Sequence, residues 1–334
     1  MSSERVLLAA LLAAVAILFL GSLLTGPAGV GLVEGLNGLF FGTSAEHEAT
    51  VLIMREIRLP RALLGFLIGA ALGLSGAALQ GYLRNPLAEP GLIGVSAGGT
   101  LGAVLAIHTG LAGLTVLALP FAGLAGAFIA MAVVLGLAGL RGGPVTLILA
   151  GVAVTSVCGA LTALALSLSR NPYATTEILF WMLGSLGDRS MLHATLAALF
   201  IVPGSLLLIL TGRALDALTL GEEAAASLGV DLDRLRGLIV LGTAFAVGAS
   251  TSVAGTIGFV GLVVPHLLRP FVKSRPGRLL LPSALGGAAL VLAADIVVRL
   301  MGDTGELKLG VLTSILGAPF FLYLVLRSRR ELMA

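Results

Sequence analysis

The chain has 334 residues, of which 57% are hydrophobic and only 11% are charged, and its mean hydropathy is +1.08. Soluble proteins carry about 25% charged residues, so a water-soluble globular fold is excluded. The net charge of +3 comes from basic residues dispersed between apolar segments, which argues against a nucleic-acid partner. A single cysteine, Cys158, rules out an internal disulfide and a thiolate metal cluster.

Long apolar windows recur along the whole chain. A bilayer core about 30 Å thick requires about 20 apolar residues per helix. The first window lacks a clear signal-peptidase site, so we expect it to remain as a helix. The sequence therefore predicts an all-α integral membrane protein with one transmembrane domain over residues 1–334. We expect ten spans, near residues 5–25, 61–83, 92–109, 113–140, 144–168, 192–211, 235–253, 257–272, 279–300 and 309–327.

The distribution of basic residues indicates the orientation of these spans. Most of the 20 Lys and Arg residues fall in segments that share a side with the N-terminus. Cytoplasmic loops of membrane proteins are enriched in Lys and Arg. Because an even number of spans returns the chain to the side where it began, we expect both termini in the cytoplasm.

Glycine and proline interrupt the apolar pattern in both halves of the chain. Pro86 and Pro90 forbid a continuous helix over residues 84–91, and the glycine-rich stretch 94–99 follows. The second half has a counterpart at 255–262, followed by Pro265. Any one of these glycines could serve close helix packing alone. Their occurrence in both halves favours a transporter built from two inverted-repeat-like halves.

The segment 212–234 is the longest predicted cytoplasmic loop. Its residues 220–229 form an acidic, alanine-rich stretch that ends at Gly229, which predicts a short surface helix. A solvated connector is the alternative. The stretch is also similar to the E-A-A-x-x-x-G pattern by which ABC importer permeases engage their ATPase.

Several further motifs run along nearly the whole chain: R-L-P-R at 58–61, Gln80, N-P-L-A-E-P-G-L-I-G-V-S at 85–96, G-F-V-G-L-V-V-P-H at 258–266, A-D at 294–295, G-V-L-T at 310–313 and G-A-P-F at 317–320. In this order they resemble the FecCD-type permease family, the membrane subunits of type II ABC importers for ferric siderophores, haem and cobalamin. The resemblance implies ten helices per subunit and a homodimer around a central pathway in the bacterial cytoplasmic membrane. It also implies two cytoplasmic ATPase subunits and a periplasmic or lipid-anchored binding protein.

The chain itself is not expected to hydrolyse ATP or to hold a cofactor. A Walker A loop needs a Gly-Lys-Ser/Thr sequence to hold phosphates. Lys273 and Lys308 follow Val272 and Leu307, so no such loop exists. ATP and Mg are therefore expected on the partner ATPase.

The resemblance assigns roles to particular positions. The region expected to couple to the ATPase is Gly221, Glu222, Glu223, Ala224, Ala225 and Gly229. The arginines expected to pair with glutamates of the binding protein are Arg58, Arg61 and Arg299, with membrane-interface anchoring as the alternative for the first two. The expected pathway residues are Gly151, Thr155, Ser156, Gly159, Thr162, Ser250, Ser252, Thr256 and Gly258. The inner gate is expected in the turn 142–146, with Gly143, Pro144, Val145 and Thr146. The structural motif residues are Asn85, Pro86, Glu89, Pro90, Pro265, His266 and Asp295.

Ionisable residues inside the spans are candidates for function. Asp295 and Arg299 stand four residues apart, so we expect a local ion pair. The four histidines, His47, His108, His193 and His266, lie in separate segments, and no metal site is predicted.

Two other classes of protein are alternatives. An ion-coupled secondary carrier would also have broken helices, but it would normally place carboxylates near the bilayer midplane, where Asp295 is the one candidate. A membrane-embedded enzyme needs a nucleophile and base or a metal site, and none stands out. The cargo stays open among siderophore, haem and cobalamin.

Overall fold

The computed structural model describes residues 3–26, 28–40, 48–139, 142–302 and 307–333, and these residues form helices and connecting turns without a strand. The helices are α1 (Ser3–Leu24), α2 (Leu32–Phe40), α3 (Glu48–Leu52), α4 (Leu59–Tyr82), α5 (Val95–His108), α6 (Ala118–Ala138), α7 (Pro144–Leu168), α8 (Pro172–Met182), α9 (Met191–Leu210), α10 (Gly212–Leu218), α11 (Glu222–Ser227), α12 (Leu232–Ala254), α13 (Val260–Leu268), α14 (Pro276–Leu300) and α15 (Leu309–Met333). A π-helical turn, η2 (Ile53–Arg58), joins α3 to α4. Shorter turns are η3 (Pro90–Ile93), η4 (Leu111–Gly113) and η5 (Arg269–Val272).

Each of the ten predicted spans coincides with a helix. Among the described residues, 8 helices are long and apolar enough to cross a membrane. The predicted windows 92–109 and 257–272 correspond to two shorter apolar helices, Val95–His108 and Val260–Val272. The predicted all-α membrane fold is therefore confirmed.

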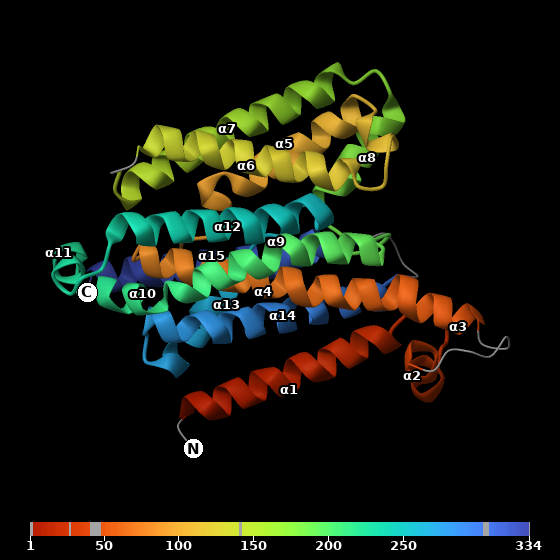
Figure 1. The fold of residues 1–334 in the computed structure, drawn as a ribbon, viewed down its shortest axis with the longest axis horizontal. Coiled ribbons are helices and arrows are strands. Elements are labelled where there is room, and N and C mark those ends of the chain that lie inside the picture. The colour runs from red at the N-terminus through yellow and green to blue at the C-terminus, as the bar shows by residue number, and fades with distance from the viewer. Residues whose placement is uncertain (1–2, 27, 41–47, 140–141, 303–306, 334) are drawn as a thin grey trace.

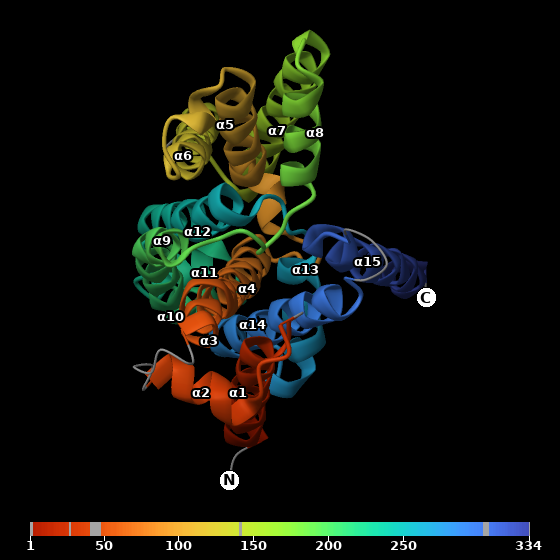
Figure 2. The ribbon, with the colours of Figure 1, turned by 90° about the vertical axis from the view of Figure 1, so that its right-hand side faces the viewer.

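The long helices lie roughly side by side and form layers (Figure 1). α5, α6, α7 and α8 form one group, and α12 lies between α6 and the pair formed by α9 and α4 (Figure 2). α4 packs along α14, and α1 covers the opposite side of α14. The core therefore runs through α4, α12 and α14.

Close packing of the central helices depends on glycine. A Cβ atom on Gly76 of α4 would overlap the backbone of Gly261 in α13. A Cβ on Gly69 or Gly73 would likewise meet the backbone of α14. Small residues at helix interfaces let backbones approach closely in lipid, where helix association depends on packing. The glycines of the central helices thus allow the close helix packing that forms the core of the bundle.

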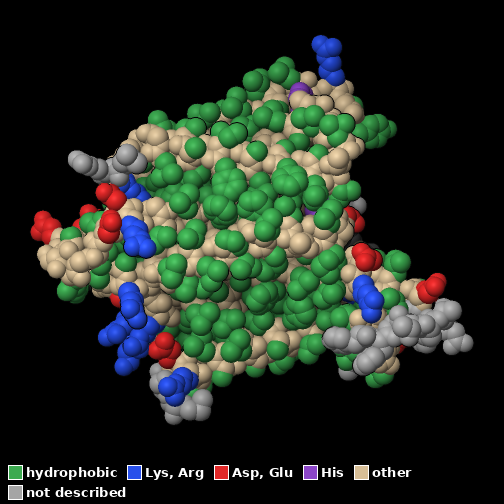
Figure 3. Space-filling view, viewed as in Figure 1, with side chains coloured by type: hydrophobic (Ala, Val, Ile, Leu, Met, Phe, Trp, Pro, Cys, Tyr) green, Lys and Arg blue, Asp and Glu red, His purple; other side chains and the backbone are tan. Residues whose placement is uncertain are grey.

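Polar ends flank the apolar surface of the molecule. A broad hydrophobic band covers the middle of the visible face, and charged side chains gather at its two ends (Figure 3). α1 begins, and α15 ends, toward the end of the bundle that carries α11 (Figure 1). We call this the α11 end, and we call the end that carries α2, α3 and α8 the α8 end.

Three segments depart from the predicted pattern. α2 and α8 fall in stretches where no span is predicted. They have 9 and 11 residues, which is too short to cross a bilayer. The second span begins earlier than predicted, since Glu48–Tyr82 continues through η2 for 35 residues.

Candidate functional site

A cavity of about 440 Å³ lies where α5 and α7 meet the broken segment between α12 and α13. It brings together four of the predicted pathway residues, Thr155, Gly159, Thr162 and Thr256. Its other lining residues are Gly91, Ser96, Ala97, Thr100, Ala163, Leu166 and Met182. The lining consists of small, hydroxyl-bearing and apolar side chains, and none of these residues is charged.

The hydroxyl groups of this cavity are only partly used by the protein. Thr100 Oγ1 donates to the Ser96 carbonyl oxygen at 2.9 Å and lies 3.3 Å from Thr256 Oγ1. The Thr155 hydroxyl has no hydrogen-bond partner among the described residues. Buried polar groups are normally paired, so an unpaired hydroxyl beside a cavity can receive a polar atom of a ligand or water.

Other predicted pathway residues lie outside this cavity. Ser250 and Ser252 are buried in α12, where their hydroxyls donate to the carbonyl oxygens of Ala246 at 2.7 Å and Ala249 at 2.9 Å. Their hydroxyls are therefore satisfied within their own helix. Ser252 also packs against Gly123 of α6.

The remaining pathway residues, Ser156, Gly151 and Gly258, each have different surroundings. Ser156 is exposed on α7, and its hydroxyl donates to the Val152 carbonyl oxygen at 2.9 Å. Gly151 packs so tightly that a Cβ atom there would overlap the backbone of η3. Gly258 lies in the broken segment, near the Glu89 carboxylate. The broken segment and the loop before α5 are thus in contact.

A larger groove of about 710 Å³ runs between α5, α6 and α7. Its walls are apolar, with Ile129, Val133 and Leu137 from α6 and Val157 and Leu161 from α7. These large side chains are exposed. Such a surface suits lipid chains, so the smaller hydroxyl-lined cavity is the better candidate for a cargo.

The loop before α5 is tied to α13 by buried polar contacts. The Glu89 carboxylate accepts the Phe259 N–H at 2.6 Å, at the start of α13. Burial raises the pKa of the Glu89 carboxyl, and this hydrogen bond opposes the shift. Pro90 packs against Gly261 of α13, and Asn85 Oδ1 accepts the Leu87 N–H at 2.9 Å. Asn85 thus forms a local turn, and Pro86 stands within it.

Gln80 of α4 adds further contacts between the loop before α5 and α13. Its Nε2 lies 3.3 Å from the carbonyl oxygens of Ala88, Gly261 and Leu262, and its Oε1 accepts from Arg269 Nη2 at 2.7 Å. A single amide therefore joins α4, the loop before α5, α13 and η5. Pro265 is buried inside α13. The ring of His266 lies edge-on to Phe320 of α15, with the ring centres 5.7 Å apart.

The predicted gate turn lies at the α11 end. Gly143 caps the start of α7, and Val145 and Thr146 are exposed. Gly142, Gly143 and Pro144 line a small cavity of about 130 Å³ together with Leu218 and Glu222. The turn and the predicted coupling segment therefore share one cavity.

The predicted short helix in the loop 212–234 is present as α11. Gly221 and Gly229 bracket it with φ angles of +104° and +86°, which favour glycine. Val230 N–H donates to the Ala225 carbonyl oxygen at 3.0 Å, which closes the helix end. Ala225 is buried, whereas Glu222 and Glu223 are exposed and Ala224 is half-buried. The helix thus presents two carboxylates at the surface.

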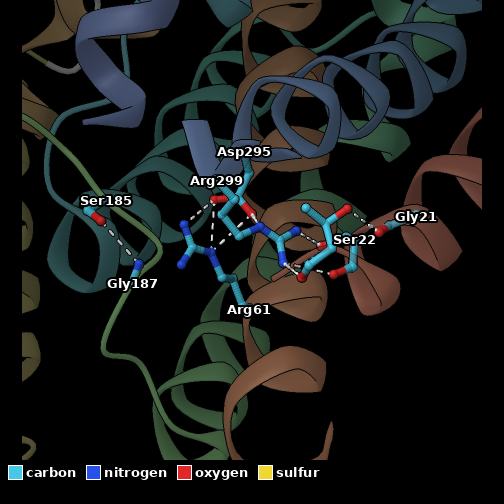
Figure 4. Close-up of polar contacts among 8 residues, drawn as sticks. Gly21, Ser22, Arg61, Ser185, Gly187, Asp295 and Arg299 are labelled. Atoms are coloured by element: carbon cyan, nitrogen blue, oxygen red, sulfur yellow. Dashed lines mark hydrogen bonds and ion pairs between the residues drawn. The ribbon is translucent and has the colours of Figure 1, made fainter. Parts of the chain in front are cut away.

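A cluster of buried charges joins the start of α4 to the last turns of α14 (Figure 4). Asp295 is 1% exposed and forms ion pairs with Arg61 at 2.9 Å and Arg299 at 3.1 Å. The Asp295–Arg299 pair expected from their spacing is confirmed. Arg299 Nη1 also donates to the carbonyl oxygens of Ser22 and Thr25, both at 2.8 Å. The cluster therefore joins α4 and α14 to the end of α1.

Arg58 also binds the end of α1. It is 3% exposed, and its guanidinium donates to the carbonyl oxygens of Leu23 at 3.0 Å, Leu24 at 3.1 Å and Ala28 at 2.6 Å. These contacts leave Arg58 little surface for a partner protein. The Arg61 side chain is 20% exposed and that of Arg299 is 8% exposed. The docking role of the three arginines stays a prediction, with Arg61 the most accessible of them.

The described residues contain no group of three or more His, Cys, Asp and Glu side chains arranged to hold a metal ion. His47 lies outside the described residues. His193 is buried at the start of α9, where its Nδ1 lies 3.0 Å from the Ser190 hydroxyl. His108 stands in the last turn of α5.

The sequence pattern of the FecCD transport family matches residues 12–327. The chain belongs to the FecCD transport family. It is 41% identical over 279 residues to the vitamin B12 import system permease protein BtuC of Citrobacter koseri, and the match covers 84% of each chain. It is also 41% identical over 280 residues to the protein of the same description from Salmonella typhi, covering 84% of this chain and 85% of that protein.

Solved structures agree with this membership. A metal-chelate type ABC transporter in an inward-facing conformation superposes with a TM-score of 0.82 and 30% identity, covering 96% of this chain and 99% of that one. A more distant likeness, PsaBC from Streptococcus pneumoniae in complex with Fab, has a TM-score of 0.52 and 14% identity, and it supports the fold alone. The chain is thus a membrane-embedded transport permease and not an enzyme.

Thr100 and Arg236 are polar residues of the site that the sequence does not predict. Thr100 lies in the cavity, but a lone threonine in an apolar helix gives no signal of its own. Arg236 stands one turn into α12 and is buried beside the gate turn. An arginine just inside an apolar span was the signal that could have found it.

Proposed function

We propose that this chain is the permease subunit of an ABC importer whose cargo is a corrinoid of the vitamin B12 class. Relatives at 41% identity are described as vitamin B12 import permeases, which supports this cargo. The observation that carries the proposal is the uncharged, hydroxyl-lined cavity. Corrinoids present neutral amide groups at their periphery, whereas haem presents carboxylates that would favour a cationic lining. Hydroxyls suit amides as hydrogen-bond partners.

The size of the cavity favours a pathway shared by two copies. A volume of about 440 Å³ suits a small ligand, and a corrinoid is larger than that. Exposed Val152, Ser156 and Gly159 follow one another at intervals of four and three residues on one face of α7, and Gly159 lines the cavity. A second copy of the chain facing this surface would enlarge the cavity and cover its open side. We therefore place the pathway at the axis of a homodimer.

Energy comes from separate ATPase subunits in this proposal. The exposed carboxylates of α11, Glu222 and Glu223, offer a docking point at the end of the molecule proposed to face the cytoplasm. ATP and Mg are held by the partner ATPase. An ion-coupled carrier is less favoured, because Asp295 is paired with two arginines and is not free to bind a coupling ion.

The other proposed partner is a binding protein, periplasmic or lipid-anchored, that delivers the cargo to the α8 end. Arg61 offers partly exposed positive charge there, and rim charges of this kind steer and orient a docking partner. The chain is proposed to lie in the bacterial cytoplasmic membrane with both termini inside the cell.

Cargo identity can be tested in cells that carry this chain as their sole permease for chelates, together with its ATPase and binding protein. Accumulation of cobalt-labelled cyanocobalamin, a labelled ferric siderophore and labelled haem would be measured in parallel. We expect cyanocobalamin to accumulate, and we expect excess unlabelled cyanocobalamin alone to suppress the signal. Accumulation of the siderophore or of haem without cyanocobalamin would overturn the corrinoid assignment.

A variant ties the cargo to the cavity. Gly159→Leu places a large side chain in the cavity from α7, where Gly159 has open space around it. Uptake is expected to fall while the amount of protein in the membrane is unchanged. Gly136→Leu is the matched control, because Gly136 is also exposed on a long helix with open space around it but does not line the cavity. Equal uptake by the two variants would argue against the cavity as the path.

A further inference from the structure

Arg236 is a buried arginine that holds the gate turn. It lies in the first turns of α12, and its side chain is 7% exposed. Its Nη1 donates to the carbonyl oxygen of Gly139 at 3.2 Å and to that of Gly142. Its Nη2 donates to Asp233 Oδ1 at 3.1 Å. One guanidinium therefore joins the start of α12 to both ends of the turn between α6 and α7.

The position of these contacts links two parts of the proposed machinery. Arg236 and Asp233 line the small cavity of about 130 Å³ that also contains Gly142, Pro144 and Glu222. Glu222 begins α11, the proposed docking point of the ATPase. Pro144 begins α7, which carries Thr155, Gly159 and Thr162 of the cargo cavity. Arg236 stands between these two elements.

The chain between α11 and Arg236 is short and well anchored. The Asp231 side chain accepts the Arg234 N–H at 2.9 Å and so caps α12. Only residues 228–231 separate α11 from α12. A displacement of α11 is therefore passed directly to the first two turns of α12, where Arg236 stands.

The chemistry of the contact requires arginine. The planar guanidinium directs several N–H groups to different acceptors at once, whereas an ammonium is a single compact centre. Gly139 ends α6 with a φ of +70°, so its carbonyl lies in the turn and not in the helix ladder. Carbonyl groups that lose a charged donor must find other partners, and this loosens the turn.

We propose that Arg236 is a positioning residue that transmits the movement of α11 to the gate turn and α7. This inference rests on the proposed function, because it takes α11 as the site where the ATPase acts. Movement of the α11 segment shifts the start of α12, and Arg236 carries the two ends of the turn with it. Asp233 holds the guanidinium in place for this task.

The test compares Arg236→Ala, Arg236→Lys and wild type in proteoliposomes that hold the full importer. ATP hydrolysis and cargo uptake are measured on the same sample. Loss of a charge-assisted contact changes an equilibrium by about tenfold or more, so uptake per ATP hydrolysed should fall by about that factor in Arg236→Ala. Hydrolysis itself should continue, and Arg236→Lys should not restore the ratio. Arg275→Ala, which removes an exposed arginine from the start of α14, should keep the wild-type ratio.

A second variant guards against simple misfolding. Asp233→Asn leaves the contacts of Arg236 with the turn in place and removes only its carboxylate partner, so it should give an intermediate ratio with unchanged thermal stability. A spin-label pair at Ser227 and Val145 supplies a readout that a purely structural role would not move. In the wild type the distance between the labels should change when ATP binds, and uptake should accompany this change. In Arg236→Ala the distance should still change on ATP binding, but uptake should no longer accompany it.

The inference fails if Arg236→Ala moves cargo at the wild-type ratio. It also fails if hydrolysis and uptake fall together in proportion, since that outcome indicates a role in docking or folding. Failure of the proposed function looks different, because wild-type proteoliposomes would then take up no corrinoid whichever arginine is present.

Discussion

At the scale of single residues, buried charge is concentrated where helices of the core meet α1. Asp295 neutralises part of the charge of Arg61 and Arg299. Arg58 and Arg299 also donate hydrogen bonds to the last carbonyl groups of α1. An apolar face of α1 packs on α14, with Val15 in a cluster with Leu285, Ala288 and Leu292, and the arginine contacts add to this packing at the end of the helix. The arginines therefore stabilise the attachment of α1 to the bundle.

Replacing Asp295 with Asn should be strongly destabilising. Two arginines would lose their shared counter-charge in a buried site, and breaking such a pair costs about 3–5 kcal/mol. The expected result is a clear drop in the thermal unfolding midpoint of the purified protein in detergent. Asp188→Asn is the control, because it removes the charge of an exposed carboxylate in the segment between α8 and α9, and it should leave the unfolding midpoint nearly unchanged. If both variants unfold at the wild-type temperature, Asp295 does not hold this cluster together.

At the scale of elements, the break before α13 is held by polar contacts and by close approach of glycines. Glu89 and Gln80 bind the start of α13 through its backbone groups. Gly76 lets α4 approach Gly261. The broken helix is therefore a rigid part of the wall beside the cavity.

Substitution of Gly76 by Val should force α4 and α13 apart. Overpacking of a tight core costs about 1–3 kcal/mol and occasionally more, and here the obstacle is backbone that cannot rotate away. We expect poor yield of folded protein and loss of uptake. Gly136→Val, on an exposed face of α6 with open space around the glycine, is the control and should express normally. Normal yield of Gly76→Val would show that the close approach is dispensable.

The prediction of the fold from sequence succeeded where length and composition decide the outcome. Ten apolar windows gave ten helices, and the glycine-bounded α11 was found from its composition. α2 and α8 were missed because short helices that do not cross a bilayer leave no long apolar window. The i, i+4 spacing predicted the Asp295–Arg299 pair. The partnership of Arg61 with Asp295 spans 234 positions and depends on tertiary packing that no local pattern records.

At the scale of the whole molecule, the two ends of the bundle have different proposed roles. α11 and the gate turn lie at one end, and the segment between α8 and α9 lies at the other (Figure 1). The cavity stands between them. We propose that cargo enters at the α8 end and leaves at the α11 end.

The proposed orientation can be tested with single cysteines. Cys158→Ser gives a background without cysteine, because the chain has only one. Ser227→Cys in α11 should resist a membrane-impermeant maleimide in spheroplasts and react after lysis, whereas Asp188→Cys should react before lysis. The reverse pattern would place α11 outside the cell and overturn the proposed ATPase contact.

We propose that this permease imports a corrinoid with energy from ATP hydrolysed on separate subunits. The most direct test is uptake of labelled cyanocobalamin by proteoliposomes that contain the permease and its ATPase, with the loaded binding protein outside and no ion gradient. We expect uptake that requires ATP and Mg at the α11 face and that stops when a non-hydrolysable ATP analogue replaces ATP. Uptake that proceeds without ATP and follows an imposed proton or sodium gradient would contradict it.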